Sequence, residues 1–209
     1  MCGRYVVTNS VSKTKKIVKK AIFVEDTQNF NAHPYQKLPI IKQYKNGNTL
    51  ENVKWGIIPK WAKDKNFKSL INARLETIDE KITFKNLIKK FRCIAIADGF
   101  YEWKRDNNDK KPFYFTSSDQ KPLYIAGIFD GEYFCLITEK AKKKITEIHH
   151  RQPVILNEND LNDYLNLVNS GSEFLKDCAK QDLVFHEVSK EVNKPSNNYG
   201  NLIKKLTNY

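Results

Sequence analysis

The second residue of the chain is a cysteine, and its position gives it distinctive chemistry. If Met1 is removed, Cys2 carries an α-amine and a thiol on adjacent carbons. The amine can attack an aldehyde to form a Schiff base, and the thiol can then close a five-membered thiazolidine ring. Because an α-amine titrates near about 7.7–8.0 and a thiol near about 8.5, both nucleophiles are partly available at neutral pH. The alternative interpretation is that Met-Cys-Gly is an ordinary chain start that leads into a strand.

Two later stretches carry titratable groups that could move protons. Glu102 follows an apolar run and lies between Tyr101 and Trp103. Desolvation should therefore raise its pKa and make it a candidate general acid or base, with an ordinary salt bridge to a lysine as the alternative. His149 and His150 form the second candidate, because histidine titrates near neutrality. A histidine at a helix C-terminus is also favourable with the helix dipole, so one of the pair can be explained that way.

Other polar and aromatic residues are candidates for binding. Arg4 places a permanent cation beside Cys2, which suits a phosphate or a carboxylate. Ile71–Thr77 combines Asn, Arg and Glu without periodicity, which indicates either a site or a buried hydrogen-bond network. Trp55 and Trp61 lie beside lysines and could form a stacking platform for bases. A core position is the alternative, and for Trp61 it is the preferred interpretation.

Composition limits the class of protein. The chain has 209 residues and is 40% hydrophobic, which is enough for one well-buried core and excludes a disordered chain. Its formal charge of +12, from 36 Lys and Arg against 24 Asp and Glu, favours a polyanionic partner such as nucleic acid. General lysine bias can produce the same excess. No apolar run reaches the roughly 18 residues of a membrane span, and no signal peptide is evident, so we expect an intracellular protein, cytoplasmic or nucleoid-associated.

The cysteines do not predict a metal site or a disulfide. None belongs to a C-x-x-C pair, so structural zinc is not expected, and without a secretory signal disulfides are not expected either. Cys93 and Cys135 lie in apolar runs typical of a core, and Cys178 has no chemical signature. We expect no metal and no cofactor.

Local patterns predict the elements that must position these groups. Strands are expected at Tyr5–Thr8, Leu38–Tyr44, Val53–Gly56, Arg92–Ala97, Pro112–Thr116, Leu123–Phe129, Tyr133–Thr138 and Leu183–Val188. Helices are expected from Ser10 or Ser12 to about Phe23, from Thr83 to about Phe91, from Thr138 to about Ile148, and at Asp160–Val168 and Ser172–Lys180. A turn is expected at Asn31–Pro34, a hairpin turn at Asn46-Gly47, a loop or hairpin tip at 105–111, and a loop and short tail from Lys190 onward. The pattern favours a single mixed, mostly antiparallel domain over residues 1–209.

Several short motifs, in the same order along about three quarters of the chain, resemble the SRAP family of abasic-site processing proteins, first labelled SOS-response-associated peptidases. They are Cys2-Gly3-Arg4-Tyr5, Asn31-x-x-Pro34, Trp55-Gly56-x-x-Pro59-x-Trp61, Asn72-Ala73-Arg74-x-Glu76-Thr77, Arg92-Cys93, Asp98-Gly99-Phe100-Tyr101-Glu102-Trp103, Ala126-Gly127 and His149-x-Arg151-x-Pro153. The resemblance implies an α+β fold: a single compact domain on a curved, mostly antiparallel, barrel-like sheet with flanking helices.

The same resemblance implies a function and a set of site residues. Cys2 would capture the ring-opened aldehyde of an abasic site in single-stranded DNA as a thiazolidine crosslink, with associated AP-lyase activity. Met1 would be removed autocatalytically or by an aminopeptidase. Asn72 would orient the sugar or the N-terminus, and Glu102 and His149 would move protons. DNA contacts would come from Arg4, Pro34, Lys54, Trp55, Arg74, Trp103 and Arg151. The implied partner is single-stranded DNA with abasic sites, including junctions with duplex DNA, bound by a monomer.

The chain departs from the family pattern at several positions. Gln152 stands where methionine is usual, Lys54 where arginine is usual and Ile96 where proline is common. Lys54 weakens the case for a bidentate phosphate clamp at that position. His150 occupies a variable position, so His149 is the preferred member of the pair.

Three other classes of protein would use some of these residues. An N-terminal-nucleophile amidohydrolase or glutamine amidotransferase also begins Met-Cys-Gly, but it leaves the Trp, Asn-Ala-Arg and Tyr-Glu-Trp stretches unexplained. A peptidase would pair Cys2 with His149, and the only cleavage we expect of it is methionine removal. A non-catalytic nucleic-acid-binding module would bind intact and abasic DNA alike and would not need Cys2.

Overall fold

The centre of the molecule is a closed ring of strands. The structure is a computed structural model that describes residues 2–14, 18, 20–22, 28–44, 47–62, 67–106, 109–178 and 182–207. The ring runs through β4 (Lys37–Tyr44), β5 (Gly47–Trp55), β11 (Tyr133–Lys140), β10 (Leu123–Asp130) and β7 (Arg92–Ala97) and returns to β4. Neighbours in the ring are antiparallel except for β5 and β11, which pair in parallel. Closure removes exposed sheet edges from this part of the fold.

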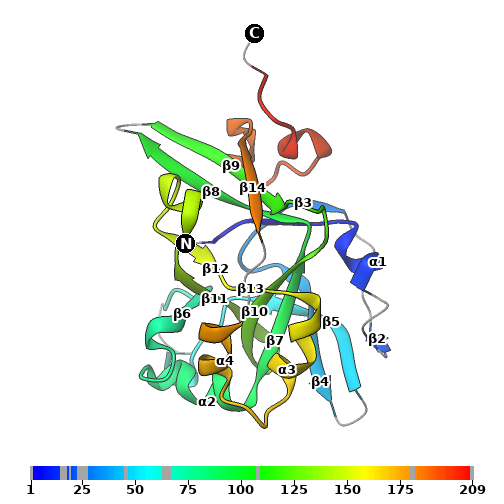
Figure 1. The fold of residues 1–209 in the computed structure, drawn as a ribbon, viewed down its shortest axis with the longest axis vertical. Helices are drawn as coiled ribbons and strands as arrows, with labels where there is room; N and C mark the ends of the chain where they lie inside the picture. Colours follow the sequence, from blue (N-terminus) through cyan, green and yellow to red (C-terminus); the bar gives the residue numbers. More distant parts are fainter. Residues whose placement is uncertain are drawn as a thin grey trace.

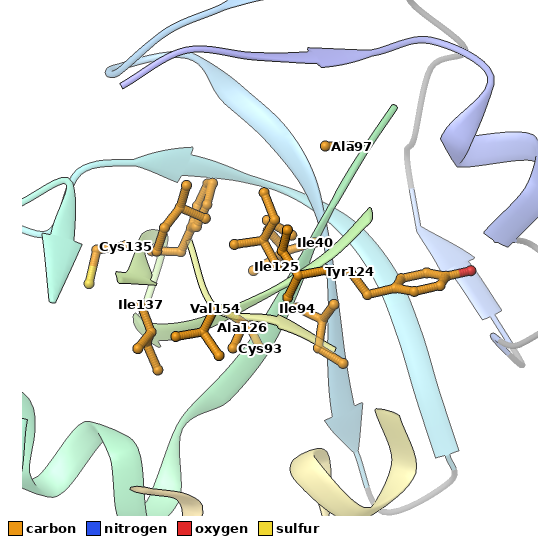
Figure 2. Packing of buried hydrophobic residues seen from close by; sticks show 14 of the residues in the cluster. Ile40, Cys93, Ile94, Ala97, Tyr124, Ile125, Ala126, Cys135, Ile137 and Val154 are labelled. Carbon is orange, nitrogen blue, oxygen red and sulfur yellow. The ribbon is translucent and has the colours of Figure 1, made fainter. Parts of the chain in front are cut away.

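The ring closes around an apolar core. All residues of β7 are buried, which explains why its sequence reads as a continuous apolar run and not as an alternating one. Figure 2 shows side chains from several ring strands gathered together, among them Ile40, Ile94, Ile125 and Ile137. Trp55 fills one part of the core and stacks on Phe134 with ring centroids 6.2 Å apart.

A second sheet carries the N-terminal strand. Its order is β14 (Leu183–Glu187), β9 (Asp109–Ser117), β8 (Gly99–Asp106), β1 (Tyr5–Val7) and β3 (Asn29–Ala32), all antiparallel. Between β7 and β8, Asp98 accepts hydrogen bonds from the Thr8 N–H and from the hydroxyls of Thr8 and Ser10. The β8–β9 hairpin projects away from the barrel at the upper left of Figure 1. This arrangement puts the residues before β1 where the barrel meets the second sheet.

Shorter elements cover the barrel. β6 (Asn72–Arg74) and β12 (Arg151–Pro153) both pair with β11, β13 (Ile155–Leu156) pairs with β10, and β2 (Lys20–Ile22) pairs with β5. The helices are α1 (Ser10–Thr14), α2 (Ile82–Lys90), α3 (Leu161–Leu165) and α4 (Gly171–Asp177), and the last three lie at the lower end of the barrel in Figure 1. Buried Arg92 donates to the backbone carbonyls of Ile88, Tyr164, Asn166 and Asn169 and so ties these helices together.

The C-terminal segment is packed structure, so the expectation of a loop and tail is wrong. It contains 3-10 helices at Lys190–Asn193 and Gly200–Ile203 and lies beside β9 at the top of Figure 1. Val188, Val192 and Leu202 are fully buried against the second sheet. Apolar residues this widely spaced give no periodic signal, so their burial could not be predicted from pattern alone.

Other expectations fail where tertiary pairing overrides local propensity. The helix expected to about Phe23 covers only Ser10–Thr14 among the described residues, and β2 pairs with β5 from Lys20; residues 15–17, 19 and 23 lie outside the described part of the chain. No helix begins at Thr138, because β11 continues to Lys140 between β6 and β12 and only a 3-10 helix follows. Asn31 and Ala32 belong to β3, so the turn comes later.

The remaining strand and helix predictions are confirmed in type. They include the hairpin β4–β5, although Asn46 lies outside the described residues, and α2, which begins one residue before the predicted Thr83 cap. No helix in the described ranges is long and apolar enough to cross a membrane. The same ranges contain no group of three or more His, Cys, Asp or Glu side chains suited to a metal.

Candidate functional site

Cys2 is held at the edge of the barrel by a side chain from β6. The Asn72 amide donates from Nδ2 to the Cys2 carbonyl at 2.9 Å, and the Cys2 thiol lies 3.9 Å from the Arg4 carbonyl. Cys2 is fully buried. The Asn72 Oδ1 atom is also buried and has no hydrogen-bond partner among the described residues, so an acceptor remains free beside Cys2. An amine or a sugar hydroxyl is the kind of donor that it could accept from.

Glu102 comes to the same place on β8. The Tyr101 N–H donates to the Arg4 carbonyl at 3.0 Å, and continuing this antiparallel register brings Glu102 beside Gly3. Glu102 is 2% exposed, and this burial raises its pKa to about 7. Burial also raises the pKa of the Cys2 thiol far above its usual range, and the Glu102 carboxylate adds to that shift. In the chain that retains Met1, the thiol is therefore neutral.

His149 is the third group of this cluster. Its Nδ1 atom lies 3.7 Å from Glu102 Oε1 and 3.0 Å from both the backbone N–H and the carbonyl of Arg151. Burial lowers the pKa of His149, so the imidazole is neutral at physiological pH. The Arg151 N–H can only donate and the Arg151 carbonyl can only accept, so Nδ1 can serve either group, and the ring proton lies on Nδ1 or Nε2 accordingly.

A cavity of about 470 Å³ opens in front of this pair. It is lined by Arg4, Glu102, Trp103, Arg105, Lys110, His149 and Asn193. Its walls therefore combine cationic side chains with one indole, above a carboxyl group and an imidazole that can exchange protons near neutrality.

A second cavity, of about 510 Å³, has Asn72 in its wall. It is lined by Trp61, Phe67, Leu70, Asn72, Arg74, Thr77, Lys81, Thr83 and Phe84. Trp61 is 59% exposed and meets Phe67 edge to face at 5.2 Å, so the expectation of a core position for Trp61 is wrong. Because Asn72 lines this cavity and also binds Cys2, the two cavities flank the start of the chain.

Several predicted contact residues do not converge on these cavities. Trp55 is fully buried and its indole donates to the Ile71 carbonyl at 2.9 Å, so the prediction that it contacts a ligand is wrong. Pro34 and Lys54 are half-buried on the approach to β4 and on β5, and neither lines the cavities described here. Arg74 is exposed and lines the second cavity.

Arg151 has a different place from the one predicted. Its guanidinium forms a bidentate pair with Glu76, at 2.7 and 2.9 Å, and donates to the Thr138 carbonyl at 2.7 Å. It is only 5% exposed. This geometry argues against a phosphate contact from Arg151, because the side chain ties β12, and with it His149, to the segment that follows β6.

Residues of the first cavity that the sequence left unassigned come from two places. Arg105 and Lys110 pair across the β8–β9 hairpin, and Arg105 follows Trp103 by two residues, so strand alternation was an available signal for it. Asn193 lies in the C-terminal segment, where no local pattern pointed to a site.

The raised pKa of Glu102 predicts a pH-dependent cost to stability. Above the unfolded pKa, near about 4.3, the unfolded chain ionises this group while the folded chain keeps it neutral, so stability falls until the pH passes about 7. Glu102→Gln should therefore gain about 3–4 kcal/mol over wild type between pH 4 and pH 8. Urea unfolding across this range would measure it, with exposed Glu173→Gln as control. A constant difference between Glu102→Gln and wild type would contradict the assignment.

Comparison with known proteins places the chain in a family. A family model described as SOS response associated peptidase (SRAP) matches residues 1–195. The abasic site processing protein YoqW of Bacillus subtilis (strain 168) is 32% identical over 222 residues, which cover 98% of this chain and 99% of the relative. YedK of Escherichia coli (strain K12), another abasic site processing protein, is 28% identical with 98% and 99% covered.

Solved structures share the fold. A crystal structure of a protein from Bacteroides thetaiotaomicron superposes with a TM-score of 0.77 at 23% identity, covering 96% of this chain and 92% of the other. A protein from Bordetella bronchiseptica superposes with a TM-score of 0.72 at 24% identity, covering 90% and 100%. With the family model matching nearly its whole length, the chain belongs to the SOS response associated peptidase (SRAP) family.

Proposed function

We propose that this protein processes abasic sites in single-stranded DNA by capturing their aldehyde on Cys2. The observation that carries the proposal is the anchoring of Cys2 by Asn72 beside the buried pair of Glu102 and His149. The names of the relatives, which are abasic site processing proteins, agree with it.

The first step is the removal of Met1. In the full chain the Cys2 nitrogen is an amide, which is not a nucleophile. Hydrolysis of the Met1–Cys2 bond consumes one water and leaves a free α-amine next to the thiol. Either an aminopeptidase or the site itself can perform this step, and Glu102 is the nearby group able to accept a proton from the attacking water.

Capture then proceeds through two bond-forming steps. The α-amine attacks C1 of the open-chain sugar, and the resulting carbinolamine loses water to give an imine. The thiol adds to the imine carbon, and the proton that it loses ends on the ring nitrogen of the thiazolidine. One water is released overall. Glu102, with a pKa of about 7, can protonate the departing hydroxyl and later accept the proton back, while the neutral imidazole of His149 can exchange a proton with a sugar oxygen.

The same intermediate accounts for strand cleavage. From the imine, removal of a C2′ proton expels the 3′ phosphate by β-elimination, which is AP-lyase chemistry. A thiazolidine cannot follow this route, so closure by the thiol protects the strand. The balance between crosslink and cleavage is therefore set by how fast the thiol reaches the imine.

The two cavities give the strand a path across Cys2. Arg74 and Lys81 stand beside the exposed Trp61 in one cavity, and Arg105 and Lys110 line the other. Cations along a backbone and aromatic rings that stack on bases are typical of single-strand binding, and the formal charge of +12 favours it further. We propose a monomer bound to single-stranded DNA, including junctions with duplex DNA.

The direct test uses an oligonucleotide with one abasic site. Incubation with the protein lacking Met1 should give a slow-migrating band on a denaturing gel, and intact mass should equal protein plus DNA minus one water. The same oligonucleotide with an ordinary nucleotide should give no band. Ammonia release from glutamine without any DNA adduct would instead support an amidohydrolase.

The placement of Arg74 predicts a salt effect. Arg74→Ala should weaken binding to abasic and intact single strands by similar factors. It should also flatten the slope of log affinity against log salt by about 0.7, the value for one phosphate of a single strand. Fluorescence anisotropy at several salt concentrations would measure this, with Lys89→Ala on α2 as control. An unchanged slope would show that Arg74 does not contact a phosphate of the strand.

A further inference from the structure

The C-terminal segment reaches the cavity beside Glu102. Val188 and Val192 are fully buried against Val6 and Tyr101, and this packing holds the 3-10 helix Lys190–Asn193 over the second sheet. As a result the Asn193 side chain lines the cavity together with Trp103. A segment nearly one hundred residues away in sequence therefore forms a wall of the candidate site.

Asn193 fixes the indole of Trp103. The Trp103 Nε1–H donates to Asn193 Oδ1 at 2.7 Å. An indole nitrogen can only donate, so the atom facing it must be the amide oxygen, and the assignment of the amide is settled by chemistry. The Nδ2 group of Asn193 then has two N–H donors, and none of the described residues accepts from them. These donors belong to an exposed side chain on the cavity wall.

The same segment fixes Arg4. Its Nη1 group donates to Asn31 Oδ1 at 2.7 Å and to the Val192 carbonyl at 2.8 Å. Asn31 is itself 1% exposed and donates to the carbonyls of Val192, Lys194 and Asn197. The bonds made by Nη1 leave the Nε and Nη2 edge of the guanidinium, the edge that can bind a phosphate with two parallel hydrogen bonds. Preorganisation of this kind lowers the entropy lost on binding.

We propose that Asn193 is a substrate-positioning residue, and that the segment Val192–Asn197 is the second wall of the DNA site. Asn193 holds the Trp103 ring in its plane and offers its amide N–H groups to a phosphodiester oxygen next to the abasic residue. The proposal rests on the proposed function. It adds a contact that acts on strand binding and not on the chemical steps, because Asn193 has no bond to Glu102, His149 or Cys2 in the described structure.

Two variants of Asn193 separate its contacts. Asn193→Ala removes both the acceptor for Trp103 and the donors. Asn193→Asp keeps an oxygen acceptor for the indole, but it removes the donors and adds a negative charge to a wall shared with Arg4 and Arg105. Asn201→Ala is the matched control, because Asn201 is an exposed asparagine of the next 3-10 helix and does not line the cavity.

The measurements are the crosslinking rate against concentration of abasic single strand, anisotropy with intact single strand, and the indole N–H signals in ¹⁵N–¹H spectra. We expect Asn193→Ala to raise the half-saturating DNA concentration about tenfold and to leave the maximal rate unchanged. A change of this size corresponds to the loss of one charge-assisted hydrogen bond to the DNA. It should shift the Trp103 signal and leave that of buried Trp55 in place. Asn193→Asp should keep the Trp103 signal and weaken binding at least as much.

Several results would overturn the proposal. Half-saturation within twofold of Asn201→Ala would show that Asn193 does not position the strand. A fall in maximal rate at unchanged half-saturation would make the effect structural. Wild-type affinity in Asn193→Asp would refute the phosphate contact. A wild-type protein that binds intact strand but never crosslinks would refute the proposed function instead, and anisotropy would still test Asn193.

Discussion

Cys2→Ala is expected to abolish the stable DNA adduct completely, because the variant has no thiol to close the thiazolidine ring. Cys178→Ala, which removes the one cysteine of the four that is not buried, should crosslink like wild type. Cys2→Ser keeps the amine, so borohydride should trap a transient imine although no thiazolidine forms. Denaturing gels with and without borohydride would measure all three variants.

The decisive control concerns Met1. A protein in which methionine removal is blocked keeps the thiol but has an amide in place of the amine, so it should form no adduct. A normal yield of stable adduct from a protein that still carries Met1 would refute capture by the amine.

The second large effect is expected from Glu102→Gln, which keeps the shape of the side chain and removes its titrating proton. Positioned acid–base groups typically contribute about 10²–10⁴-fold, so crosslink formation should slow by that order while DNA affinity stays near wild type. Release of the DNA should slow as well, because reversal uses the same proton transfers. Time courses of formation, and of release into excess competitor DNA, would measure both rates.

The pH dependence gives this prediction a sign. With a pKa of about 7, Glu102 is protonated below neutrality and ionised above it. Steps that need its proton should therefore slow as the pH rises through about 7, and steps that need its carboxylate should accelerate. Glu102→Gln should lose both inflections. If it matched wild type in rate and profile, Glu102 would be a structural residue.

His149→Ala is the companion to this test. Its neutral imidazole can give or accept a proton in the cavity, so the variant should slow both adduct formation and strand cleavage by β-elimination. His150→Ala is the matched control, because His150 is exposed, its ring lies 4.4 Å from that of His149, and it does not line the cavity. Equal effects from the two variants would leave the choice of His149 without support.

The groups with chemistry could be predicted from the sequence, because their types and motif spacing are local information. The structure brings Asn72 within hydrogen-bond distance of Cys2 and Glu102 near His149. Exposure could not be predicted in the same way. Trp55 and Trp61 are both tryptophans beside lysines, yet one fills the barrel and the other faces solvent. Trp55 is in the core because it lies at the end of β5, where β5 pairs in parallel with β11.

The ion-pair partner of each arginine is the other property that could not be predicted from the sequence. Arg151 and Arg74 were equivalent candidates for a phosphate, and only the fold shows that Glu76 occupies one of them. The C-terminal segment is the clearest case. Its buried valines and leucine are too far apart to suggest an element, and its contribution to the cavity depends on packing against strands made from distant parts of the chain.

The hydrogen bonds around the N-terminus also fix when the site can exist during synthesis. Residues 2–4 leave the ribosome before their hydrogen-bond partners, which are Asn72, Tyr101 on β8 and the carbonyl of Val192. At about 5–20 residues per second, translation from Arg4 to Val192 takes roughly 10–40 s, so during that time residues 2–4 exist while some of their partners do not. During that time Cys2 lacks the hydrogen bond from Asn72 or the Arg4 contact with Val192 that surrounds it in the folded protein. The surroundings that we propose to make Cys2 selective for one aldehyde are complete only after Val192 has been translated.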